Sequence, residues 1–548
     1  MPITQYLERN AREYGDEICL VEINPELKEK QKLTWKDYSL VETIPSQDHR
    51  RELSWKEFDD KANRFANYLI SRNTKRGEKI GILLMNCLEW LPIYFGILKA
   101  GALAVPLNYR YTADEIKYCL DLADCSCLVF GKEFIGRMES ICDCLPKTVE
   151  GLLFVGEDCP TFAESYDELV KNMPSDKPNI ELDDEDFAAI YFSSGTTGFP
   201  KAILHKHKSL ECSAKAEQAH HGQKRGDCFL CIPPLYHTGA KMHWFGSLIS
   251  ASKAVLLKGV SPKWIIQTVA DEKCTIVWLL VPWAQDILDA IDRGEIDLAK
   301  YDLKQWRLMH IGAQPVPPSL IARWKKVFPE HQYDTNYGLS ESIGPGCVHL
   351  GVENINKVGA IGIAGYGWQT RIVDSNRRDV KRGEVGELAV KGDGVMTCYY
   401  KDEQATAATL SEDGWLFTGD MAKEDEDGFI YLVDRKKDVI ITGGENIYPV
   451  QIEDFMRGCD AIRDVAVIGL PDERLGEIAA AIVELKPEYE GKITKEDIDA
   501  FCLPLPRYKR PKTVIFADVP RNPTGKIEKP KLREKYCGGS LVEKQIKR

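Results

Sequence analysis

The sequence FAAIYFSSGTTGFPK, residues 187–201, joins a short apolar run to a loop rich in hydroxyl groups and glycine. The run Phe187–Phe192 has the length and continuous hydrophobicity of a buried strand. Gly195 and Gly198 have no side chain, so backbone amides can approach an anion there, and Lys201 adds positive charge. Four residues add hydroxyl donors: Ser193, Ser194, Thr196 and Thr197. The pattern predicts a strand and an anion-binding loop, although it is not a Walker A motif, and a flexible linker is the plainer alternative.

The composition sets limits on the class of protein. The chain has 548 residues. Single hydrophobic cores stop growing at about 250–300 residues, so this chain is too long for one core. Its 44% apolar and 28% charged residues are ordinary for a soluble globular protein, which excludes disordered, fibrous and membrane classes. The net charge of −12 argues against broad binding to nucleic acid or anionic membranes. A local pocket for an anion remains compatible with it.

Cysteine usage and the absence of targeting patterns indicate a cytoplasmic protein. The 17 cysteines suit reduced thiols packed as small hydrophobes. The Cys228–Cys231 pair encloses two apolar residues, which favours a buried strand over a metal or redox site, and we expect the nearby His220–His221 to lie in a solvated loop. We expect no signal peptide, and the longest apolar stretch, Ile276–Trp283, is far shorter than the roughly 20 residues of a membrane span.

Apolar runs separated by amphipathic stretches indicate layers of helices on buried sheets. Ser54 and Glu57 form a capping-box pattern that predicts the start of a helix. Residues 346–434 are rich in glycine, aspartate and short alternating runs, which predicts a β-rich unit, and 438–548 read as a separate α+β unit. The apolar runs of the first part are Lys79–Met85, Cys127–Phe130, Leu152–Val155, Phe187–Phe192, Cys228–Ile232, Ala254–Leu257 and Thr275–Leu280.

Two further segments place unusual residues after apolar runs. PPLYHTGA (233–240) sets His237 among apolar and small residues, although a lone histidine is more often structural. GAQPVPP (312–318) is a glycine and proline turn that follows the run Leu308–Ile311. Each could be an ordinary connection or the wall of a pocket.

Two more segments combine aromatic, hydroxyl and carboxylate groups. In NYGLSE (336–341), Tyr337 could stack on a base and Glu341 could hold a hard cation through oxygen. WLFTGD (415–420) ends an apolar run on Asp420, an acceptor suited to ribose hydroxyls. Taken alone, the first could be a turn with a solvated carboxylate and the second an ordinary turn residue.

In this order, SSGTTGFPK, YGLSE, TGD, DRKKDVIITGGENIYP and NPTGKIEK resemble the motifs of the adenylate-forming superfamily. This superfamily includes acyl- and aryl-CoA synthetases, firefly luciferase and peptide-synthetase adenylation domains. The resemblance extends over nearly the whole chain and includes GILKAGALAVPLN (96–108). It implies an α/β fold with a large N-terminal domain, residues 1–434, of layered αβ subdomains and a β-rich portion. A hinge at 435–437 and a small mobile α+β C-terminal domain at 438–548 would follow.

The resemblance implies an ATP-dependent, AMP-forming ligase acting on a fatty or aryl acid. Such an enzyme joins a carboxylate to the α-phosphate of ATP, releases pyrophosphate, and passes the acyl group to the thiol of coenzyme A, with Mg²⁺ as a cofactor. A polar acid such as a carnitine-like substrate also fits. The alternatives are an enzyme that loads a carrier protein and a nucleotide-binding regulator without turnover. We expect no nucleic-acid partner and no membrane span, and a homodimer is open.

The resemblance also implies the residues that bind ATP. Those at the triphosphate are Ser193, Ser194, Gly195, Thr196, Thr197, Gly198 and Lys201. Those of the adenine cleft are Gly312, Ala313, Gln314, Asn336, Tyr337 and Gly338. Ser340 would face the α-phosphate, where many members have threonine, while Asp420 and Arg435 would hold the ribose. Ala202, after Lys201, replaces a usual glycine, and Gln314 replaces a usual alanine.

Further implied roles concern catalysis and the second substrate. Lys526 matches the catalytic lysine, which bridges the carboxylate and the α-phosphate, and Glu341 matches the Mg²⁺ ligand. Lys437 matches the pivot of the hinge, and His237 matches a position that shapes the acyl pocket. Gly443 and Gly444 would line the pantetheine tunnel of coenzyme A. The implied lining of the acyl pocket is Tyr236–Lys241, Trp283, Ile311–Gly312 and Gly338–Gly344, with His243 and Trp244 adding bulk or polarity.

Overall fold

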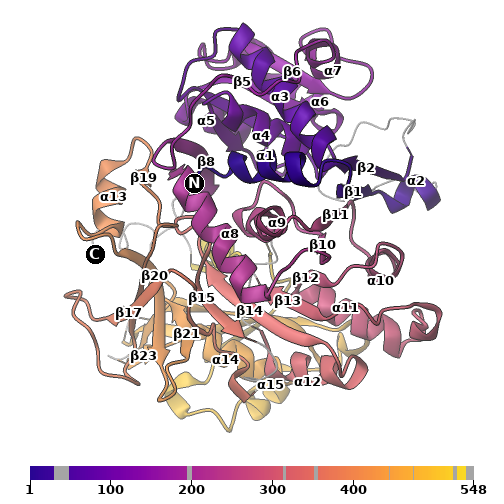
Figure 1. The fold of residues 1–548 in the computed structure, drawn as a ribbon. Helices are drawn as coiled ribbons and strands as arrows, with labels where there is room; N and C mark the ends of the chain where they lie inside the picture. The colour runs from indigo at the N-terminus through magenta and orange to yellow at the C-terminus, as the bar shows by residue number, and fades with distance from the viewer. Residues whose placement is uncertain are drawn as a thin grey trace.

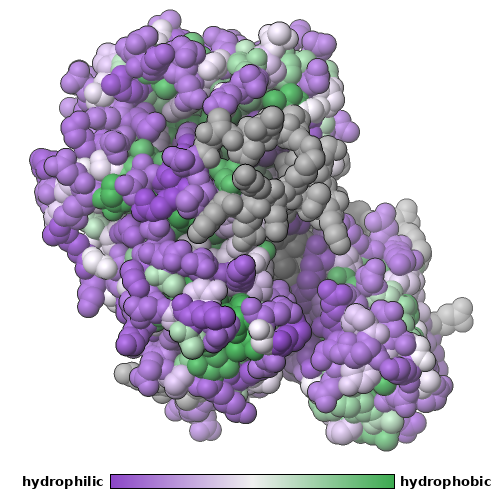
Figure 2. Space-filling model, turned by 90° about the vertical axis from the view of Figure 1, so that its right-hand side faces the viewer, coloured by the Kyte–Doolittle hydropathy of each residue, from purple (hydrophilic) through white to green (hydrophobic). Residues whose placement is uncertain are grey.

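The computed structural model describes eight stretches of the chain: residues 1–29, 48–193, 200–312, 316–350, 356–442, 445–472, 474–521 and 527–537. Within them the strands form two large sheets and two small ones (Figure 1). The face drawn in Figure 2 is mostly hydrophilic, with hydrophobic side chains in scattered groups. Within the described ranges, no helix combines the length and apolar character that crossing a membrane requires.

The first large sheet has eight strands and contains the predicted anion-binding loop. Its strands, in spatial order, are β19 (Cys398–Tyr399), β9 (Lys201–Lys206), β8 (Phe187–Ser193), β4 (Leu103–Pro106), β3 (Lys79–Leu83), β5 (Cys125–Gly131), β6 (Gly151–Val155) and β7 (Glu164–Ser165). Strands β3 to β6 pair in parallel, whereas β8 and β9 pair antiparallel, and the continuous apolar runs agree with the predicted buried sheet. Residues 194–199, which lie outside the described residues, fall between these two adjacent antiparallel strands.

Helices cover this sheet, and the first long one begins where the capping box predicted. The Ser54 hydroxyl accepts from the Glu57 amide at 3.2 Å, and the Glu57 carboxylate accepts from the Ser54 amide at 2.8 Å. This exchange satisfies two amides that a helix start leaves without partners. The helices of this part are α3 (Trp55–Ser71), α4 (Trp90–Lys99), α5 (Ala113–Leu122), α6 (Ile135–Ile141) and α7 (Tyr166–Val170).

The second large sheet has nine strands and carries the adenine-cleft segments. Its strands, in spatial order, are β16 (Ile363–Ala364), β15 (Pro345–Leu350), β14 (Gln332–Gly338), β13 (Leu308–Gly312), β12 (Ile276–Leu280), β10 (Cys228–Cys231), β11 (Lys253–Leu257), β1 (Ile18–Ile23) and β2 (Arg50–Ser54). Its helices are α1 (Thr4–Glu13), α2 (Pro25–Glu29), α8 (His207–His221), α9 (Thr238–Ser250), α10 (Pro262–Asp271), α11 (Val281–Asp292) and α12 (Pro318–Val327). The Cys228–Cys231 segment is a buried strand, as predicted.

Two small sheets lie in the later part of the chain, where a β-rich unit and an α+β unit were predicted. The first contains β17 (Gln369–Val373), β18 (Gly386–Lys391), β20 (Leu416–Glu424) and β21 (Ile430–Arg435), with α13 (Glu403–Thr409) nearby in sequence. The second contains β23 (Glu445–Ile447), β22 (Ile440–Thr442), β25 (Gly476–Leu485), β24 (Ile462–Asp472) and β26 (Thr513–Phe516). Its helices are α14 (Pro449–Met456), α15 (Lys495–Phe501) and α16 (Lys529–Cys537).

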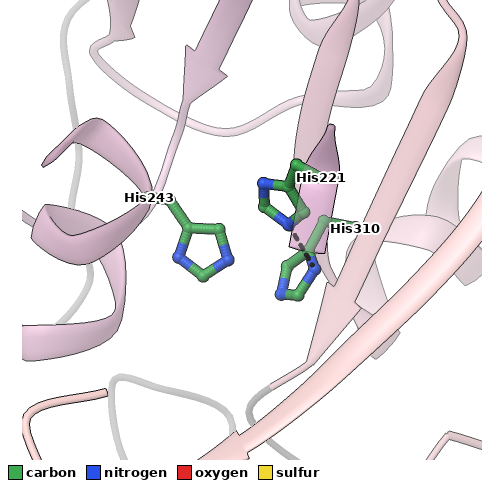
Figure 3. Close-up of side chains that lie close together, drawn as sticks. All are labelled: His221, His243 and His310. Carbon is green, nitrogen blue, oxygen red and sulfur yellow. Dashed lines mark hydrogen bonds between the residues drawn. The ribbon is translucent and has the colours of Figure 1, made fainter. Parts of the chain in front are cut away.

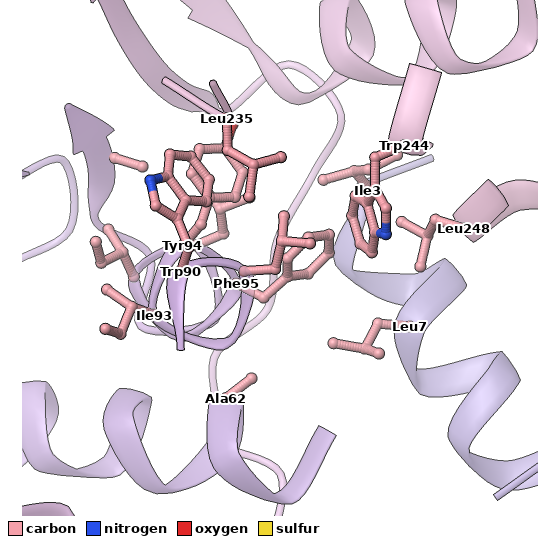
Figure 4. Packing of buried hydrophobic residues seen from close by; sticks show 14 of the residues in the cluster. Ile3, Leu7, Ala62, Trp90, Ile93, Tyr94, Phe95, Leu235, Trp244 and Leu248 are labelled. Atoms are coloured by element: carbon pink, nitrogen blue, oxygen red, sulfur yellow. The ribbon is translucent and has the colours of Figure 1, made fainter. Parts of the chain in front are cut away.

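An aromatic core joins helices of the two large sheets. Trp90, Tyr94 and Phe95 of α4 belong to the buried cluster that Figure 4 shows, together with Trp244 of α9. The Phe95 and Trp244 ring centroids lie 5.6 Å apart in an edge-to-face arrangement. Burying one such side chain contributes roughly 1.5–3 kcal/mol. Trp244, expected near the acyl pocket, is therefore part of the structural core.

Lys241 of α9 is also buried in this core, among three aromatic rings. Its Nζ lies 4.1 Å from the ring centroid of Tyr191, 4.8 Å from that of Tyr94 and 5.1 Å from that of Trp90. The ammonium donates to the Leu235 carbonyl at 3.4 Å. Burial lowers the pKa of Lys241 well below its usual value. This lysine was expected to line the acyl pocket, and the structure places it in the core instead.

We expect Lys241→Met to be more stable than the wild type at neutral pH, by an amount that shrinks as the pH rises. The unfolded amine titrates near about 10.4, above the lowered pKa of the native state. Between these two pKa values the unfolded chain binds more protons, so wild-type stability rises with pH. In urea denaturation, the difference in free energy of unfolding between the variant and the wild type should shrink by up to about 1.4 kcal/mol per pH unit.

The matched control for this prediction is Lys253→Met. Lys253 is a partly exposed lysine of β11 whose ammonium lies 3.3 Å from the Glu272 carboxylate. Its replacement removes a favourable ion pair, so this variant should not be more stable than the wild type at neutral pH. If Lys241→Met instead loses the same stability at every pH, the three rings hold a charged ammonium and the prediction is wrong.

Candidate active site

The antiparallel pairing of β8 and β9 brings Ser193 opposite Lys201, so the two ends of the predicted anion-binding loop are adjacent. Lys201 begins β9, and its Nζ lies 4.6 Å from the ring centroid of Tyr399. Tyr399 reaches this place because β19 adds to the edge of the sheet, with Tyr399 opposite Ile203. The predicted phosphate-binding lysine is therefore held against an aromatic ring.

Glu341 approaches the same tyrosine from the second large sheet. The Tyr399 hydroxyl donates to Glu341 Oε1 at 2.9 Å, and the Glu341 carbonyl accepts from the Met396 amide at 2.7 Å. Burial and the nearby Glu341 carboxylate raise the pKa of Tyr399, so the hydroxyl stays a donor. Tyr399 thus brings together Lys201 and Glu341, which sequence reasoning assigned to the triphosphate and to Mg²⁺.

Ser340 is held in place through its backbone. The Nε2 of His205, on β9, donates to the Ser340 carbonyl at 2.9 Å. Burial lowers the pKa of His205 to about 4, so the ring is neutral with its proton on Nε2. This hydrogen bond does not involve the Ser340 hydroxyl. It fixes the backbone immediately before Glu341.

Tyr399→Phe is expected to weaken the use of Mg²⁺ without disturbing Lys201. The variant keeps the ring under the Lys201 ammonium but loses the hydrogen bond to Glu341. Hydrogen bonds to charged groups contribute about 1.5–3 kcal/mol, so losing this one could weaken Mg²⁺ binding by roughly 100-fold at most. We expect the Mg²⁺ concentration for half-maximal pyrophosphate release to rise, with the rate recovering at saturating Mg²⁺.

The neighbouring tyrosine gives a matched control. The Tyr400 hydroxyl donates to Asp124 at 3.0 Å, away from Glu341. Tyr400→Phe should leave the Mg²⁺ dependence unchanged. An equal shift in both variants would mean that Tyr399 acts only through the stability of this edge of the sheet.

A second group forms where β20 and β21 pair. Asp420 and Arg435 are directly opposite each other in this pairing, and Arg435 Nε lies 3.7 Å from Asp420 Oδ1. The hydroxyl of Tyr337, on β14, donates to Asp420 Oδ2. Asp420 was expected to end an apolar run, but β20 continues to Glu424, so the aspartate lies within a strand. The predicted ribose residues and the predicted adenine-stacking tyrosine therefore contact one another.

Gly312 and Gly338 end the neighbouring parallel strands β13 and β14. Ligands of α/β sheets bind beyond such carboxyl ends, which agrees with an adenine cleft here. A Cβ on Gly312 would lie 3.7 Å from Trp278 Nε1, and one on Gly239 would lie only 2.8 Å from the Trp278 ring. The side-chain amide of Asn336, on β14, donates to Glu217 of α8.

The residues expected around the acyl group are only partly brought together. His237 caps the start of α9, where its Nδ1 accepts from the Gly239 amide at 3.2 Å. Trp278 and His310 lie beside Gly312, and sequence reasoning missed both because each is inside a continuous apolar strand. Trp283, which was expected in the pocket, packs against a separate buried cluster that includes side chains of α10, α11 and α12.

Comparison with known proteins defines the family of this chain. The family model described as AMP-binding enzyme matches residues 7–400, and that of the AMP-binding enzyme C-terminal domain matches residues 451–526. The chain belongs to the AMP-binding, adenylate-forming family. This confirms the predicted resemblance and the α/β fold with a large N-terminal and a small C-terminal domain.

Within the AMP-binding family, the chain is similar to acid–CoA ligases. It is 31% identical over 481 residues to the long-chain-fatty-acid–CoA ligase FadD13 of Mycobacterium tuberculosis, covering 87% of this chain and 91% of that one. It is 32% identical over 495 residues to the 3-[(3aS,4S,7aS)-7a-methyl-1,5-dioxo-octahydro-1H-inden-4-yl]propanoyl:CoA ligase of Rhodococcus jostii, covering 87% and 93%. A solved fatty acyl CoA synthetase of Mycobacterium tuberculosis superposes with a TM-score of 0.74 at 27% identity, covering 98% of each chain. The protein is an AMP-forming acid–CoA ligase.

In this AMP-binding enzyme, buried carboxylates lie on both sides of the predicted hinge residues 435–437. Asp434 accepts from the Val450 amide of α14 at 2.9 Å, and Asp438 forms an ion pair with Arg533 of α16. Burial raises the pKa of Asp434 to about 6, whereas Arg533 holds that of Asp438 low against its burial. Burial, followed by the nearby Arg435 charge, lowers the pKa of Lys437.

Several predicted site residues of the AMP-binding enzyme lie outside the described residues. They are Ser194, Gly195, Thr196, Thr197, Gly198, Ala313, Gln314, Gly443, Gly444 and Lys526. Their roles stay predictions. The strands that flank Gly443 and Gly444 pair antiparallel, with Thr442 opposite Glu445.

Proposed function

We propose that this ligase activates a fatty or aryl carboxylic acid and that Lys201, Glu341, Tyr337, Asp420 and Arg435 hold the ATP. The observation that carries the proposal is the convergence of these residues in two adjacent groups. Lys201 and Glu341 both contact Tyr399, while Asp420 contacts Tyr337 and Arg435. One group suits the phosphates and the other suits the nucleoside.

In the first half-reaction the carboxylate oxygen attacks the α-phosphorus, and the bond to pyrophosphate breaks. Two anions approach each other, so donors must be aimed at the charge that develops on phosphorus. Lys201 would hold the outer phosphates and Lys526 would bridge the two reacting groups. Mg²⁺, when bound through the Glu341 carboxylate, would neutralise phosphate charge, and a carboxylate oxygen is the ligand that it prefers.

In the second half-reaction the thiol of coenzyme A attacks the acyl carbonyl, and AMP leaves. We propose that the domain beginning at about residue 438 rotates on residues 435–437 between the two steps, withdrawing Lys526 and bringing Gly443 and Gly444 to the thiol path. Hinges of this kind are a few residues that absorb large changes of φ and ψ. The proposal is supported by the direct succession of Arg435, Lys436 and Lys437 between two buried aspartates.

A pyrophosphate-release screen over a panel of carboxylic acids, with and without coenzyme A, tests this function. We expect AMP release that requires both an acid and coenzyme A. The panel should include polar acids, because the buried Trp278 Nε1 has no hydrogen-bond partner in the described structure and lies beside Gly312. Thioester formation only with a carrier protein would favour the loading enzyme, and ATP binding without acyl-AMP would favour the regulator.

A further inference from the structure

Three buried histidines from three elements meet behind Gly312, and the proposed reaction uses none of them. They are His221 at the end of α8, His243 of α9 and His310 of β13 (Figure 3). One ligand nitrogen from each lies within 4.8 Å of the others. The His221 and His310 nitrogens, Nε2 and Nδ1, are 3.3 Å apart.

The prediction that His220–His221 lies in a solvated loop is wrong. Helix α8 continues to His221 and ends on Gly222 in the left-handed conformation, with φ of 54°. The His221 side chain is consequently only 1% exposed. Sequence reasoning failed here because the polar residues after the pair suggested a loop, while the histidines themselves face the core.

Two buried carboxylates complete the group. Glu217 lies one helical turn before His221, and its Oε2 is 3.4 Å from His221 Nε2 and 3.5 Å from His243 Nε2. Asp334 of β14 places Oδ2 at 3.3 Å from His221 Nε2, and its Oδ1 accepts from His310 Nδ1. Among the described residues no lysine or arginine forms an ion pair with Glu217. The group therefore places two carboxyl groups among three imidazole rings.

The proposed ligands include three buried atoms without a hydrogen-bond partner in the described structure. They are Glu217 Oε2, His243 Nε2 and His310 Nε2. A buried polar atom without a partner is costly, which indicates that something else satisfies these atoms.

The spacing of the donor atoms identifies what could satisfy them. Zn²⁺ binds imidazole nitrogen and carboxylate oxygen at about 2.0–2.2 Å in a tetrahedron, whose edges are then roughly 3.3–3.5 Å. Glu217 Oε2 lies 3.4 Å from His221 Nε2 and 3.5 Å from His243 Nε2, which matches such edges. We propose that Glu217, His221, His243 and His310 bind a divalent transition-metal ion of the Zn²⁺ class, with Asp334 as the carboxylate that orients His310.

The ion would hold the elements that line the active site in fixed relative positions. It would join α8 to α9, β13 and β14, the three elements that begin or end at His237, Gly312 and Gly338. It lies behind these residues and needs no contact with ATP. This proposal is independent of the acid that the ligase uses, since metal binding can be measured without turnover.

The test is the metal content of the full chain, purified without a histidine tag from cells grown with added Zn²⁺. We expect about one equivalent of metal per chain by plasma mass spectrometry. His243→Gln and Glu217→Gln should lower metal affinity by about tenfold or more. His331→Ala is the matched control, because His331 is buried against Phe328, with ring centroids 4.6 Å apart, outside the cluster. It should keep the metal.

A second measurement uses the wild-type protein, so it does not depend on whether a variant folds. Co²⁺ added to chelator-treated wild-type protein should produce the visible absorption bands of a tetrahedral site, and Zn²⁺ should abolish them and raise the melting temperature. Wild-type protein that is purified without metal, and that gives neither bands nor a thermal shift with Co²⁺ or Zn²⁺, would overturn the proposal. Metal retained in both cluster variants would also overturn it.

Discussion

Lys526→Ala is expected to slow acyl-AMP formation by about 10²–10³-fold, the usual effect of removing one preorganised charge from a transition state. Conversion of supplied acyl-AMP to the thioester should stay close to the wild-type rate. The reason is that two anions, the carboxylate and the α-phosphate, must approach each other only in the first half-reaction, and Lys526 lies in the PTGKIEK segment that matches the catalytic lysine. Pyrophosphate release measures the first step, and mixing acyl-AMP with coenzyme A measures the second.

Lys531→Ala is the matched control, since Lys531 is an exposed lysine of the same basic segment that pairs with Glu528 at 2.7 Å. Lys529 would be a poor control because its ammonium is buried against Glu453 at 2.8 Å, and its loss would damage the domain. Equal losses of both half-reactions in Lys526→Ala would contradict a lysine that serves one step and is then withdrawn. They would leave the family assignment intact.

The parts of the fold that were predictable are those determined by neighbours in sequence. The Ser54–Glu57 capping box and the apolar run of β8 each involve residues within a few positions, so local hydrogen bonding and burial suffice to define them. The order of the motifs then identified the family. The exact end of a strand was less predictable. β20 continues through Asp420 because it pairs with β21, the following strand of the same hairpin.

The residues that sequence reasoning missed reach the site through distant pairing. Tyr399 touches Lys201 and Glu341 only because β19 adds to β9, almost 200 residues earlier in the chain, and nothing in the local sequence CYYKD indicates that partner. His221 and His310 come together because α8 packs over the second large sheet. Such contacts depend on the tertiary fold, and one histidine in an apolar strand carries no signal of its own.

The acidic net charge of −12 is compatible with binding ATP because cations are placed locally. Lys201 lies against Tyr399, and Arg435 lies beside Asp420 with nearly half of its side chain exposed. An exposed guanidinium next to a carboxylate can turn toward a ligand, whereas a buried pair cannot without loss of stability. This local placement suits the proposed roles of the two groups, which would accept an anion and a sugar without making the whole surface basic.

Asp420→Ala is expected to raise the KM for ATP by about 10²-fold or more, since a carboxylate that accepts ribose hydroxyls contributes roughly 1.5–3 kcal/mol for each hydrogen bond. In the described structure Oδ2 of Asp420 accepts from Tyr337 and Oδ1 faces Arg435, so both oxygens point toward the proposed nucleoside site. Initial rates of pyrophosphate release at varied ATP measure the effect. Asp425→Ala is the matched control, because Asp425 follows β20 but pairs with Lys357 at 2.7 Å away from the cleft, and its KM for ATP should not change. If Asp420→Ala lowers the melting temperature but leaves the KM for ATP unchanged, Asp420 only anchors Tyr337 and Arg435, and the ribose is held elsewhere.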